Sequence, residues 1–426
     1  MSRPLPKPLD IAIIGGGPTG LTCAVALARK GIFANIYEAK TSFNEAGVGI
    51  GLGPNALHIL DGIGVLQDAL RMSDEDEANM APFVFLSGMG NHELIYDYPV
   101  IPAHVSAGLP RSSLVKAMGF HIDPKYAHFN KKCTEITSSQ VNPSRSTLCF
   151  SDGSTAEADV VLVCSGIKSA VRSAVTGKKS TDCVSYSNTY CYRAVVPTDQ
   201  AKASGVKTDF TRRPVCFVGK DKHFIIFPIR GGKLINIVAF VADRTINIGD
   251  KNLRPDQPTV VPVSCAELMD AFDGWGNDVI RLLGCMVKAT RWSINVLHPH
   301  LPTFVKGKVA LLGDAAHAML PHLGAGAGQC IEDAYLLANL LSLPEVNIDN
   351  IESVLKVYDE VRRPRALSVW EGSLRQGENY ESCGKSGSSA EAIRQDLTGS
   401  FDFVWDYPVD DDMKKATIRL RELQIL

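Results

Sequence analysis

Three glycines near the N-terminus have the spacing of a phosphate-binding turn. They form the pattern Gly15-x-Gly17-x-x-Gly20, which follows an apolar run at residues 11–14. Such glycines permit a tight turn and close approach of the backbone to a pyrophosphate, and the following helix directs N–H groups and its positive dipole end at the phosphates. Glu38 stands 18 residues after Gly20, where a carboxylate can accept hydrogen bonds from both ribose hydroxyls. The spacing therefore predicts a dinucleotide site.

A second group of residues with chemical potential lies far along the chain. Gly313 and Asp314 follow the apolar run 308–312, and a glycine-rich stretch, 321–329, then begins a helix near Gly326. An aspartate at a strand end can bind a ligand hydroxyl, although many such residues only cap a helix. Bare backbone amides at a helix N-terminus suit a ring that carries negative charge when it is reduced. This combination favours a flavin over other dinucleotides.

The elements that must position these residues alternate between strands and helices. A strand at 11–14, a helix from Leu21 to Lys30 and a strand at 34–37 make a complete βαβ unit. Further buried strands are predicted at 159–164 and 308–312, and a long helix at 326–341. Strand-like and turn-like segments dominate from 186 to 296. We therefore expect an α/β protein in which a β-rich part interrupts the nucleotide-binding part.

Composition narrows the class of protein. The 426 residues carry a formal net charge of −2, so no basic field is available to hold nucleic acid. Eleven cysteines occur without a CxxC pair, which favours a reducing compartment over a disulfide framework. The first ten residues lack the apolar core of a signal peptide, and no apolar run reaches the length of a membrane span. We expect a soluble cytoplasmic protein without nucleic acid or stable membrane insertion.

Together these motifs resemble the class A FAD-dependent aromatic hydroxylases, and most closely their salicylate hydroxylase-like branch of fungal type. The similarity extends over nearly the whole length, and the Pro321–Asp333 block is its most specific part. The other matching segments are Gly15–Gly20, Glu38, Gly49–Asn55, Arg111, Tyr192-Arg193, Gly313-Asp314, Arg362–Arg365 and Trp405-Asp406.

The resemblance implies a three-layer, Rossmann-like FAD-binding domain of the glutathione-reductase type, with an inserted β-sheet substrate domain and a helical C-terminal part. The expected limits are 1–82, 103–184 and 297–345 for the FAD domain, 83–102 and 185–296 for the substrate domain, and 346–426 for the helical region. Only one dinucleotide pattern is present. FAD would occupy it without a covalent bond, and NADH or NADPH would bind transiently as the co-substrate.

The resemblance also implies an activity and a set of residues. The enzyme would use NAD(P)H and O2 to hydroxylate an electron-rich phenol or phenolic acid through a flavin C4a-hydroperoxide, with loss of carbon dioxide where the attacked carbon bears a carboxylate. We expect a monomer or homodimer and no metal. The residues expected to hold FAD are Gly15, Gly17, Thr19, Gly20, Glu38, Gly51, Arg111, Asp314, Gly324, Gly326, Ala327 and Gly328.

Two residues are catalytic candidates by the same resemblance. Arg193 would hold a phenolate or carboxylate, whereas any single arginine more often lies on a solvent face. For His322, proton handling or substrate anchoring is as plausible as a satisfied core histidine. His317 and Cys330 are expected to pack in the core. The arginines of Arg362–Arg365 are expected on a solvated helix face, without a catalytic role.

Two departures from the family pattern leave alternatives open. Ser165 stands where relatives have an aspartate that contacts FAD and the nicotinamide, and Phe227 stands where some fungal relatives have a tyrosine. The alternatives are a fungal secondary-metabolism monooxygenase for a larger phenolic polyketide or prenylated substrate, and a flavin-binding protein with impaired NAD(P)H reduction. A halogenase is disfavoured because the four tryptophans are isolated, and a disulfide reductase because no redox cysteine pair is present.

Overall fold

A six-stranded sheet carries the N-terminal glycine pattern. In the computed structural model, which describes residues 9–44, 49–76, 78–211, 213–250 and 258–426, its strand order is β18-β19-β11-β1-β2-β7. The strands from β19 to β7 run parallel and β18 is antiparallel. Their bounds are β1 (Ile11–Ile14), β2 (Asn35–Tyr37), β7 (Ala127–His128), β11 (Val160–Val163), β18 (Val305–Lys306) and β19 (Val309–Leu311). Every residue of β1 and β11 is buried, as expected for parallel strands covered on both faces.

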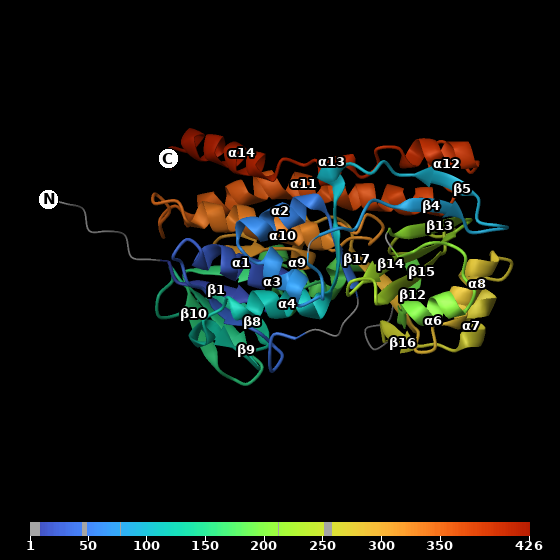
Figure 1. Cartoon of the computed structure of the whole chain (residues 1–426). Helices are drawn as coiled ribbons and strands as arrows, with labels where there is room; N and C mark the ends of the chain where they lie inside the picture. Colours follow the sequence, from blue (N-terminus) through green and yellow to red (C-terminus); the bar gives the residue numbers. More distant parts are fainter. Residues whose placement is uncertain (1–8, 45–48, 77, 212, 251–257) are drawn as a thin grey trace.

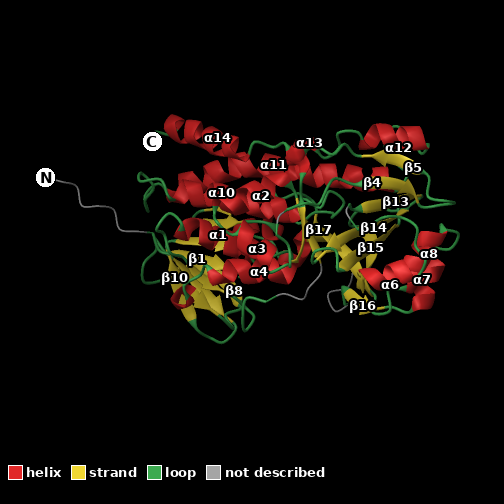
Figure 2. Ribbon diagram, viewed as in Figure 1, coloured by secondary structure: helices red, strands yellow, loops and turns green. Residues whose placement is uncertain are grey.

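Helices and a small second sheet enclose this central sheet. Figure 2 shows α1 (Pro18–Ala28) and α10 (Gly326–Leu341) on one side and the three-stranded sheet β10-β9-β8 on the other. The strands of the small sheet are β8 (Cys133–Ser138), β9 (Ser146–Phe150) and β10 (Thr155–Ala158). The ring of Phe150 lies 4.8 Å from that of Tyr37 on β2. The predicted three-layer FAD-binding fold is confirmed.

The turn between β1 and α1 requires glycine at two positions. Gly15 has φ +109°, a conformation that L side chains rarely adopt. A Cβ at Gly20 would lie only 2.0 Å from the carbonyl oxygen of Gly15. The helix can therefore approach the turn closely only because both residues lack a side chain.

An eight-stranded sheet forms the other half of the molecule (Figure 1). Its order is β16-β17-β12-β15-β14-β13-β4-β5, with one parallel pair, β13 and β4. The bounds are β4 (Val84–Ser87), β5 (Leu94–Asp97), β12 (Val184–Pro197), β13 (Val215–Gly219), β14 (Lys222–Ile229), β15 (Leu234–Ala242), β16 (Val260–Pro262) and β17 (Thr290–Leu297). The domain limits given by the resemblance stay a prediction.

Side-chain alternation divides this sheet into two faces. Phe217, Phe224 and Ile237 belong to a core cluster with α6 (Thr198–Ala203), α7 (Cys265–Ala271) and α8 (Asn277–Gly284). The opposite face carries the residues next to these in sequence: Cys216, Ile225 and Val238. They are paired with one another across the sheet. Because successive residues of a strand point to opposite faces, the second set faces the FAD-binding half.

One long helix connects the two halves. Helix α11 (Ile351–Tyr380) contains Pro364 and runs across the top of both sheets in Figure 1. The helix ends at Tyr380, and Glu381 follows as its C-cap residue. Helix α14 (Val409–Glu422) packs against it.

The prediction that Arg362–Arg365 lie on a solvated helix face is wrong for two of its arginines. The side chain of Arg362 is 0% exposed, and Arg365 is also buried. Arg362 donates hydrogen bonds to Asp333 at 2.8 Å, to Glu332 at 2.8 Å and to Asp412 at 3.0 Å. Carboxylates on α10 and α14 thus compensate the charge of Arg362. The pattern of residues within α11 alone cannot reveal these partners.

Asp333 extends this cluster to the turn that carries Asp314. Its second oxygen accepts the Gly313 N–H at 2.9 Å and contacts His317 Nε2 at 2.6 Å. Burial raises the pKa of Asp333, but His317 and Arg362 lower it more, so the carboxylate stays ionised. The predicted packing role of His317 is confirmed.

Two broad expectations from composition can be compared with the structure. All eleven cysteines are free thiols, and Cys330 is buried in α10 as predicted. Within the ranges that the structure describes, no helix has the length and apolar character needed to cross a membrane. Residues 1–8, most of the segment in which a signal peptide was sought, lie outside those ranges.

Replacing Arg362 with Met should destabilise the protein strongly. The variant leaves three buried carboxylates without their common cation, a change that costs about 3–5 kcal/mol in the free energy of unfolding. Urea denaturation followed by tryptophan fluorescence measures this loss. The matched control is Arg363→Met, because Arg363 pairs with Asp359 at 3.2 Å and its side chain is 31% exposed. Equal losses in the two variants would contradict the assigned role of Arg362.

Candidate active site

A cavity of about 680 Å³ lies between the two sheets and collects most of the predicted site residues. Ten of the twelve residues expected to hold FAD line it: Gly15, Gly17, Thr19, Glu38, Gly51, Arg111, Asp314, Gly324, Gly326 and Ala327. Both catalytic candidates, Arg193 and His322, also line it. Gly20 and Gly328 do not: Gly20 packs against Gly15, and a Cβ at Gly328 would lie 3.3 Å from the Asn55 amide nitrogen. These two glycines permit close packing behind the cavity wall.

At one end of the cavity, Glu38 is held against the glycine turn. Glu38 directly follows β2, and its Oε2 accepts the Gly16 N–H at 2.6 Å. Its Oε1 accepts the Lys40 N–H at 2.8 Å. The carboxylate is therefore oriented by the backbone on both sides, beside the N-terminus of α1.

Two glycines in the cavity wall leave space that a side chain would fill. No atom lies within 4 Å of a Cβ built on Gly51 or on Gly324. Gly51 belongs to β3 (Gly49–Leu52), and Gly324, with φ +61°, precedes α10. A cavity that is lined by bare backbone, by a glycine turn and by the N-terminus of a 16-residue helix fits a dinucleotide.

Asp314 is distant from Glu38 in the chain, but it too follows a parallel strand of the six-stranded sheet, β19. It begins the short helix α9 (Asp314–His317), directly after Gly313, which has φ +60°. A Cβ at Gly313 would lie 2.6 Å from Thr19 Oγ1 and 2.7 Å from Cys330 Sγ. Close packing on α1 and α10 therefore presses this turn, and Asp314 with it, into the cavity wall.

Arg193 faces the cavity because it lies two residues after Cys191 on β12, and both residues point to the same side of the sheet. Among the described residues its buried Nε has no hydrogen-bond partner. The guanidinium lies over the Trp292 ring, 5.5 Å from the ring centroid. Burial lowers the pKa of Arg193, and the nearby Arg111 cation lowers it further. A buried guanidinium in this setting is ready to bind an anion.

His322 is both a core histidine and a cavity residue. Its ring is 5% exposed and packs against His223 and Phe240, with centroid distances of 5.1 and 5.2 Å. Burial, followed by the neighbouring His223, lowers the pKa of His322 to about 3. The imidazole is therefore neutral near pH 7. This state suits a hydrogen bond to a ligand better than storage of a proton.

The rest of the cavity wall on the side of Arg193 and His322 is apolar. The eight-stranded sheet contributes every second residue of two strands. These are Ile225 and Phe227 on β14, and Val238 and Phe240 on β15. Phe227 has no hydroxyl, and its ring fills the space beside Gly49 and Gly108. Further apolar members are Met80, Phe83, Ile294, Met319, Leu320, Phe401 and Trp405. Such a wall excludes water and holds a flat hydrophobic ring.

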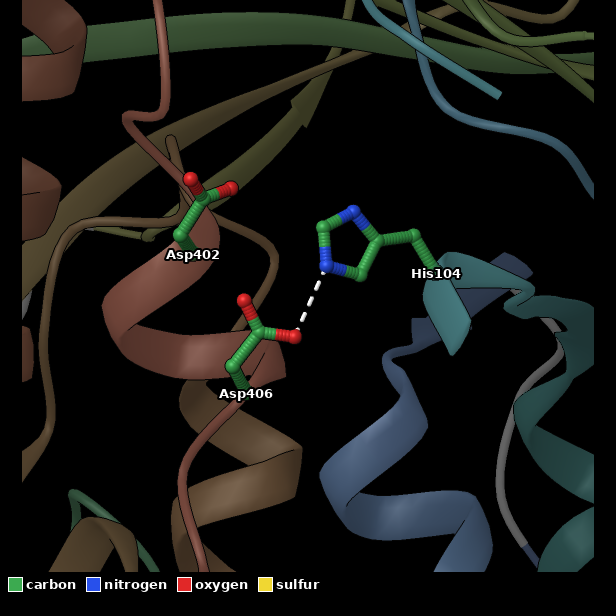
Figure 3. A group of neighbouring side chains, drawn as sticks. All are labelled: His104, Asp402 and Asp406. Carbon is green, nitrogen blue, oxygen red and sulfur yellow. Dashed lines mark hydrogen bonds and ion pairs between the residues drawn. The ribbon is translucent and has the colours of Figure 1, made fainter. Parts of the chain in front are cut away.

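Trp405 reaches the cavity through contacts that the sequence did not indicate. Figure 3 shows His104 beside Asp406, where Nε2 donates a hydrogen bond of 2.8 Å to the carboxylate, with Asp402 one helical turn earlier on α13 (Asp402–Trp405). Tyr98 donates a hydrogen bond of 2.6 Å to Asp402. The His104, Asp402 and Asp406 group therefore fastens α13 to the segment around residues 98–104 and places Trp405 beside Gly53.

Ser165 lies in the cavity wall, and its hydroxyl donates a 2.8 Å hydrogen bond to Ser169. The side chain of Arg172, which is near Ser165 in the chain, does not face the cavity. Its guanidinium is buried and donates to the carbonyls of Ala315 and Ile167, at 2.8 and 2.6 Å. Lys168, whose side chain is exposed, also lines the cavity near Ser165.

Comparisons with known proteins agree with this geometry. The family described as FAD binding domain matches residues 8–200 and 286–373. A salicylate hydroxylase of Pseudomonas putida is 34% identical over 421 residues, which cover 97% of this chain and 95% of the relative. The FAD-dependent monooxygenase pigN of Monascus ruber is 32% identical over 430 residues, with 96% of each chain covered.

Solved structures lead to the same assignment. A salicylate hydroxylase substrate complex superposes with a TM-score of 0.84 at 30% identity, covering 96% of this chain and 98% of that one. CtdE in complex with FAD and a substrate shares the fold, with a TM-score of 0.78 at 18% identity and coverage of 98% and 99%. The chain therefore belongs to the family of FAD-dependent monooxygenases of the salicylate hydroxylase type.

Proposed function

We propose that this monooxygenase hydroxylates a phenol or salicylate-like phenolic acid, with NADH or NADPH as the reductant. The observation that carries the proposal is the buried Arg193 guanidinium, whose Nε has no partner among the described residues, at the apolar end of the cavity. A phenolate or carboxylate of the substrate would pair with this buried cation, and an aromatic ring suits the apolar wall around it.

The other end of the cavity fits FAD. Glu38 would accept the ribose hydroxyls, the glycine turn and α1 would face the pyrophosphate, and Asp314 would accept a hydroxyl of the ribityl chain. When bound, FAD accepts hydride from NAD(P)H and activates dioxygen. The protein then supplies the orientation of the substrate ring, the exclusion of water and the hydrogen bonds at Arg193 and His322. A carboxylate on the attacked carbon would leave as carbon dioxide.

A larger phenolic substrate of fungal secondary metabolism is the second candidate. Its support is the similarity to fungal monooxygenases, such as pigN and the dual enzyme tazHJ of Aspergillus terreus, each 32% identical over 96% of this chain. Substrate-stimulated NAD(P)H oxidation with product mass analysis separates the two candidates. Salicylate and a panel of larger phenols are the probes, and the better substrate class is the one whose product gains one oxygen, with or without the loss of carbon dioxide, with tight coupling to NAD(P)H use.

Asp314→Ala should weaken FAD binding while leaving the fold intact. A lost hydrogen bond between a hydroxyl and a carboxylate costs about 1.5–3 kcal/mol, which raises the dissociation constant roughly 10- to 100-fold. Flavin fluorescence titration of the apoprotein measures it. The FAD affinity of Asp314→Asn, which retains an acceptor oxygen, should lie between those of the parent and of Asp314→Ala. An unchanged affinity in Asp314→Ala would show that Asp314 does not hold the flavin.

Arg193→Ala should remove substrate-stimulated turnover and keep FAD. The loss of a charge-assisted contact predicts a fall in kcat/KM of roughly 10- to 100-fold. Arg291→Ala is the matched control, because Arg291 lies on the neighbouring strand, stacks on Tyr190 and pairs with Glu267 at 2.8 Å, yet does not line the cavity. Loss of flavin from Arg193→Ala, or equal activity in the two variants, would refute a substrate role.

Ser165→Asp should lower the KM for NAD(P)H and leave kcat nearly unchanged. A carboxylate that binds the nicotinamide adds uniform binding, and one such hydrogen bond changes KM by roughly tenfold. Stopped-flow reduction of the flavin at sub-saturating NAD(P)H gives the comparison. Ser173→Asp adds the same charge at the exposed first residue of the nearby short helix α5 (Ser173–Thr176), outside the cavity. Slower or unaltered reduction in Ser165→Asp would mean that Ser165 is not a weakened nicotinamide contact.

A further inference from the structure

Three oxidisable aromatic side chains lead from the cavity wall to the outer surface, and we call them the aromatic row. The row begins at Trp405, which lines the cavity, and continues through the buried Tyr98, directly after β5. It ends at Tyr96 on β5, which is half-buried on a strand whose first residue, Leu94, is 57% exposed. The row therefore connects the cavity that fits FAD with solvent.

The inner end of the aromatic row lies beside the flavin cradle. A Cβ at Gly53 would lie 3.1 Å from the indole Nε1 of Trp405. Gly53 precedes α2 (Pro54–Gly62) and lies two residues after Gly51, where the cavity wall is bare backbone. All four tryptophans belong to the described ranges, and of these only Trp405 lines the cavity. An electron-rich indole is thus exposed to an oxidant that forms in the cavity.

Each step of the aromatic row is a direct contact between rings. The ring centroids of Trp405 and Tyr98 are 5.5 Å apart, and the rings meet edge to face at 69°. The centroids of Tyr98 and Tyr96 are also 5.5 Å apart, at 73°. Such edge-to-face pairs are favourable contacts between aromatic side chains. Because electron transfer slows steeply with distance, rings in contact can exchange electrons rapidly.

The middle ring of the row has a proton acceptor at hydrogen-bond distance. The Tyr98 hydroxyl donates a hydrogen bond of 2.6 Å to Asp402 Oδ1. Burial, followed by this hydrogen bond, raises the pKa of Tyr98 above its usual range, so the phenol is protonated near neutral pH. A phenol loses an electron far more easily when its proton leaves in the same step. Asp402 can accept that proton without movement of either side chain.

The other rings around Trp405 do not offer a competing path. Phe401 stacks on Trp405 with a centroid distance of 4.5 Å and an interplanar angle of 15°, and His104 lies 5.1 Å away. Phe83 continues the stack on Phe401 at 5.8 Å. A benzene ring without a hydroxyl and an imidazole are both much harder to oxidise than an indole or a phenol. Among the ring contacts of the described residues, Tyr98 is therefore the one phenol beside Trp405.

We propose that Trp405, Tyr98 and Tyr96 carry single oxidising equivalents from the cavity to solvent. Trp405 gives one electron to a one-electron oxidant in the cavity, of the radical class that forms when activated oxygen is not transferred to a substrate. Tyr98 then gives one electron to the oxidised indole, and its phenol proton passes to Asp402. Tyr96 returns an electron to Tyr98, which regains its proton from Asp402, while the Tyr96 proton leaves to water. A soluble thiol finally restores Tyr96 by donating a hydrogen atom.

This electron path is a function separate from hydroxylation, and it does not depend on a phenolic substrate. Its benefit lies in the sulfur-containing side chains that share the cavity with Trp405. Met80 and Met319 line the same wall, and oxidation would convert these apolar thioethers into polar groups. Removal of an unused oxidising equivalent through the row preserves the apolar wall. Asp402 then has two roles, since it anchors α13 and accepts the Tyr98 proton.

The test uses the FAD-loaded protein without NAD(P)H or substrate and a flash of blue light, because light makes oxidised FAD a strong one-electron oxidant. Transient absorption distinguishes the indole radical of tryptophan from the phenoxyl radical of tyrosine. The parent should form an indole radical that converts into a phenoxyl radical. Trp405→Phe should lose both signals, whereas Tyr98→Phe should keep the indole radical and lose its conversion. Asp402→Asn should slow the conversion by about tenfold or more.

The last step of the row is tested with glutathione as the soluble thiol. Added glutathione should shorten the lifetime of the phenoxyl radical in the parent, because Tyr96 is half-buried and reaches solvent. In Tyr96→Phe the radical remains on the buried Tyr98, so glutathione should leave its lifetime unchanged. Equal shortening in the parent and in Tyr96→Phe would overturn Tyr96 as the outlet of the row.

Trp292→Phe and Tyr380→Phe are the matched controls, because Trp292 lies beneath Arg193 and Tyr380 packs on Phe85, both outside the row. Each should retain both radical signals. Absence of the indole radical in the FAD-loaded parent, or its persistence in Trp405→Phe, would overturn the start of the row. Normal conversion in Tyr98→Phe, or its loss in Tyr380→Phe, would overturn the path through Tyr98. If Trp405→Phe does not bind FAD, Tyr98→Phe alone decides.

Discussion

The buried contact between Arg362 and Asp333 is the interaction on which the FAD-binding half depends. Asp333 accepts from Arg362 through one oxygen and from Gly313 through the other. One carboxylate therefore joins the long helix α11, the helix α10 and the turn that presents Asp314. Removing water from this pair is costly, and the arrangement is stable because every carboxylate oxygen at the centre has a donor. Glu332 extends the same network to the Asn55 amide at 2.6 Å, which fixes the segment next to Gly51.

Buried charge is compensated in the FAD-binding half of the site but not fully in the substrate half. Around Arg362 each charge is compensated, so the scaffold under the flavin cradle is rigid. At Arg193 a buried cation faces an apolar cavity, stacks on Trp292 and has an Nε without a partner among the described residues. This arrangement costs stability in the absence of a ligand and becomes favourable when an anion binds. The contrast assigns one region to support and the other to recognition.

A second group of buried polar side chains lies in the substrate half, where His322, His223, Glu381 and Arg244 contact one another in that order. Beside the cavity, the ring of His322 packs on that of His223, and His223 contacts the buried carboxylate of Glu381 at 3.0 Å. His322 in the cavity wall is neutral, whereas Glu381, at 1% exposure, is ionised. His223 lies between these two side chains. Strand alternation produces this placement: His223 shares a face of β14 with Ile225 and Phe227.

Local sequence determined the parts of this protein that depend on neighbouring residues. The βαβ unit with Gly15 and Gly20 was predictable because a tight turn and a close helix leave no space for a Cβ. The start of α10 at Gly326 and the strands around it were predictable from apolar runs that end at glycines. Of the twelve residues expected to hold FAD and the two catalytic candidates, all except Gly20 and Gly328 line one cavity.

Tertiary structure decided whatever depends on a partner distant in the chain. The burial of Arg362 follows from carboxylates on α10 and on α14, and no pattern within α11 reveals them. Trp405 lines the cavity because Tyr98 and His104 bind α13 from about 300 positions earlier in the chain, a contact without local periodicity. The role of His322 was undecided in the sequence, since its protonation depends on burial and on His223, 99 positions away. Hydrophobic periodicity specifies which face of an element is buried, but not which charges meet there; only the assembled fold brings those charges together.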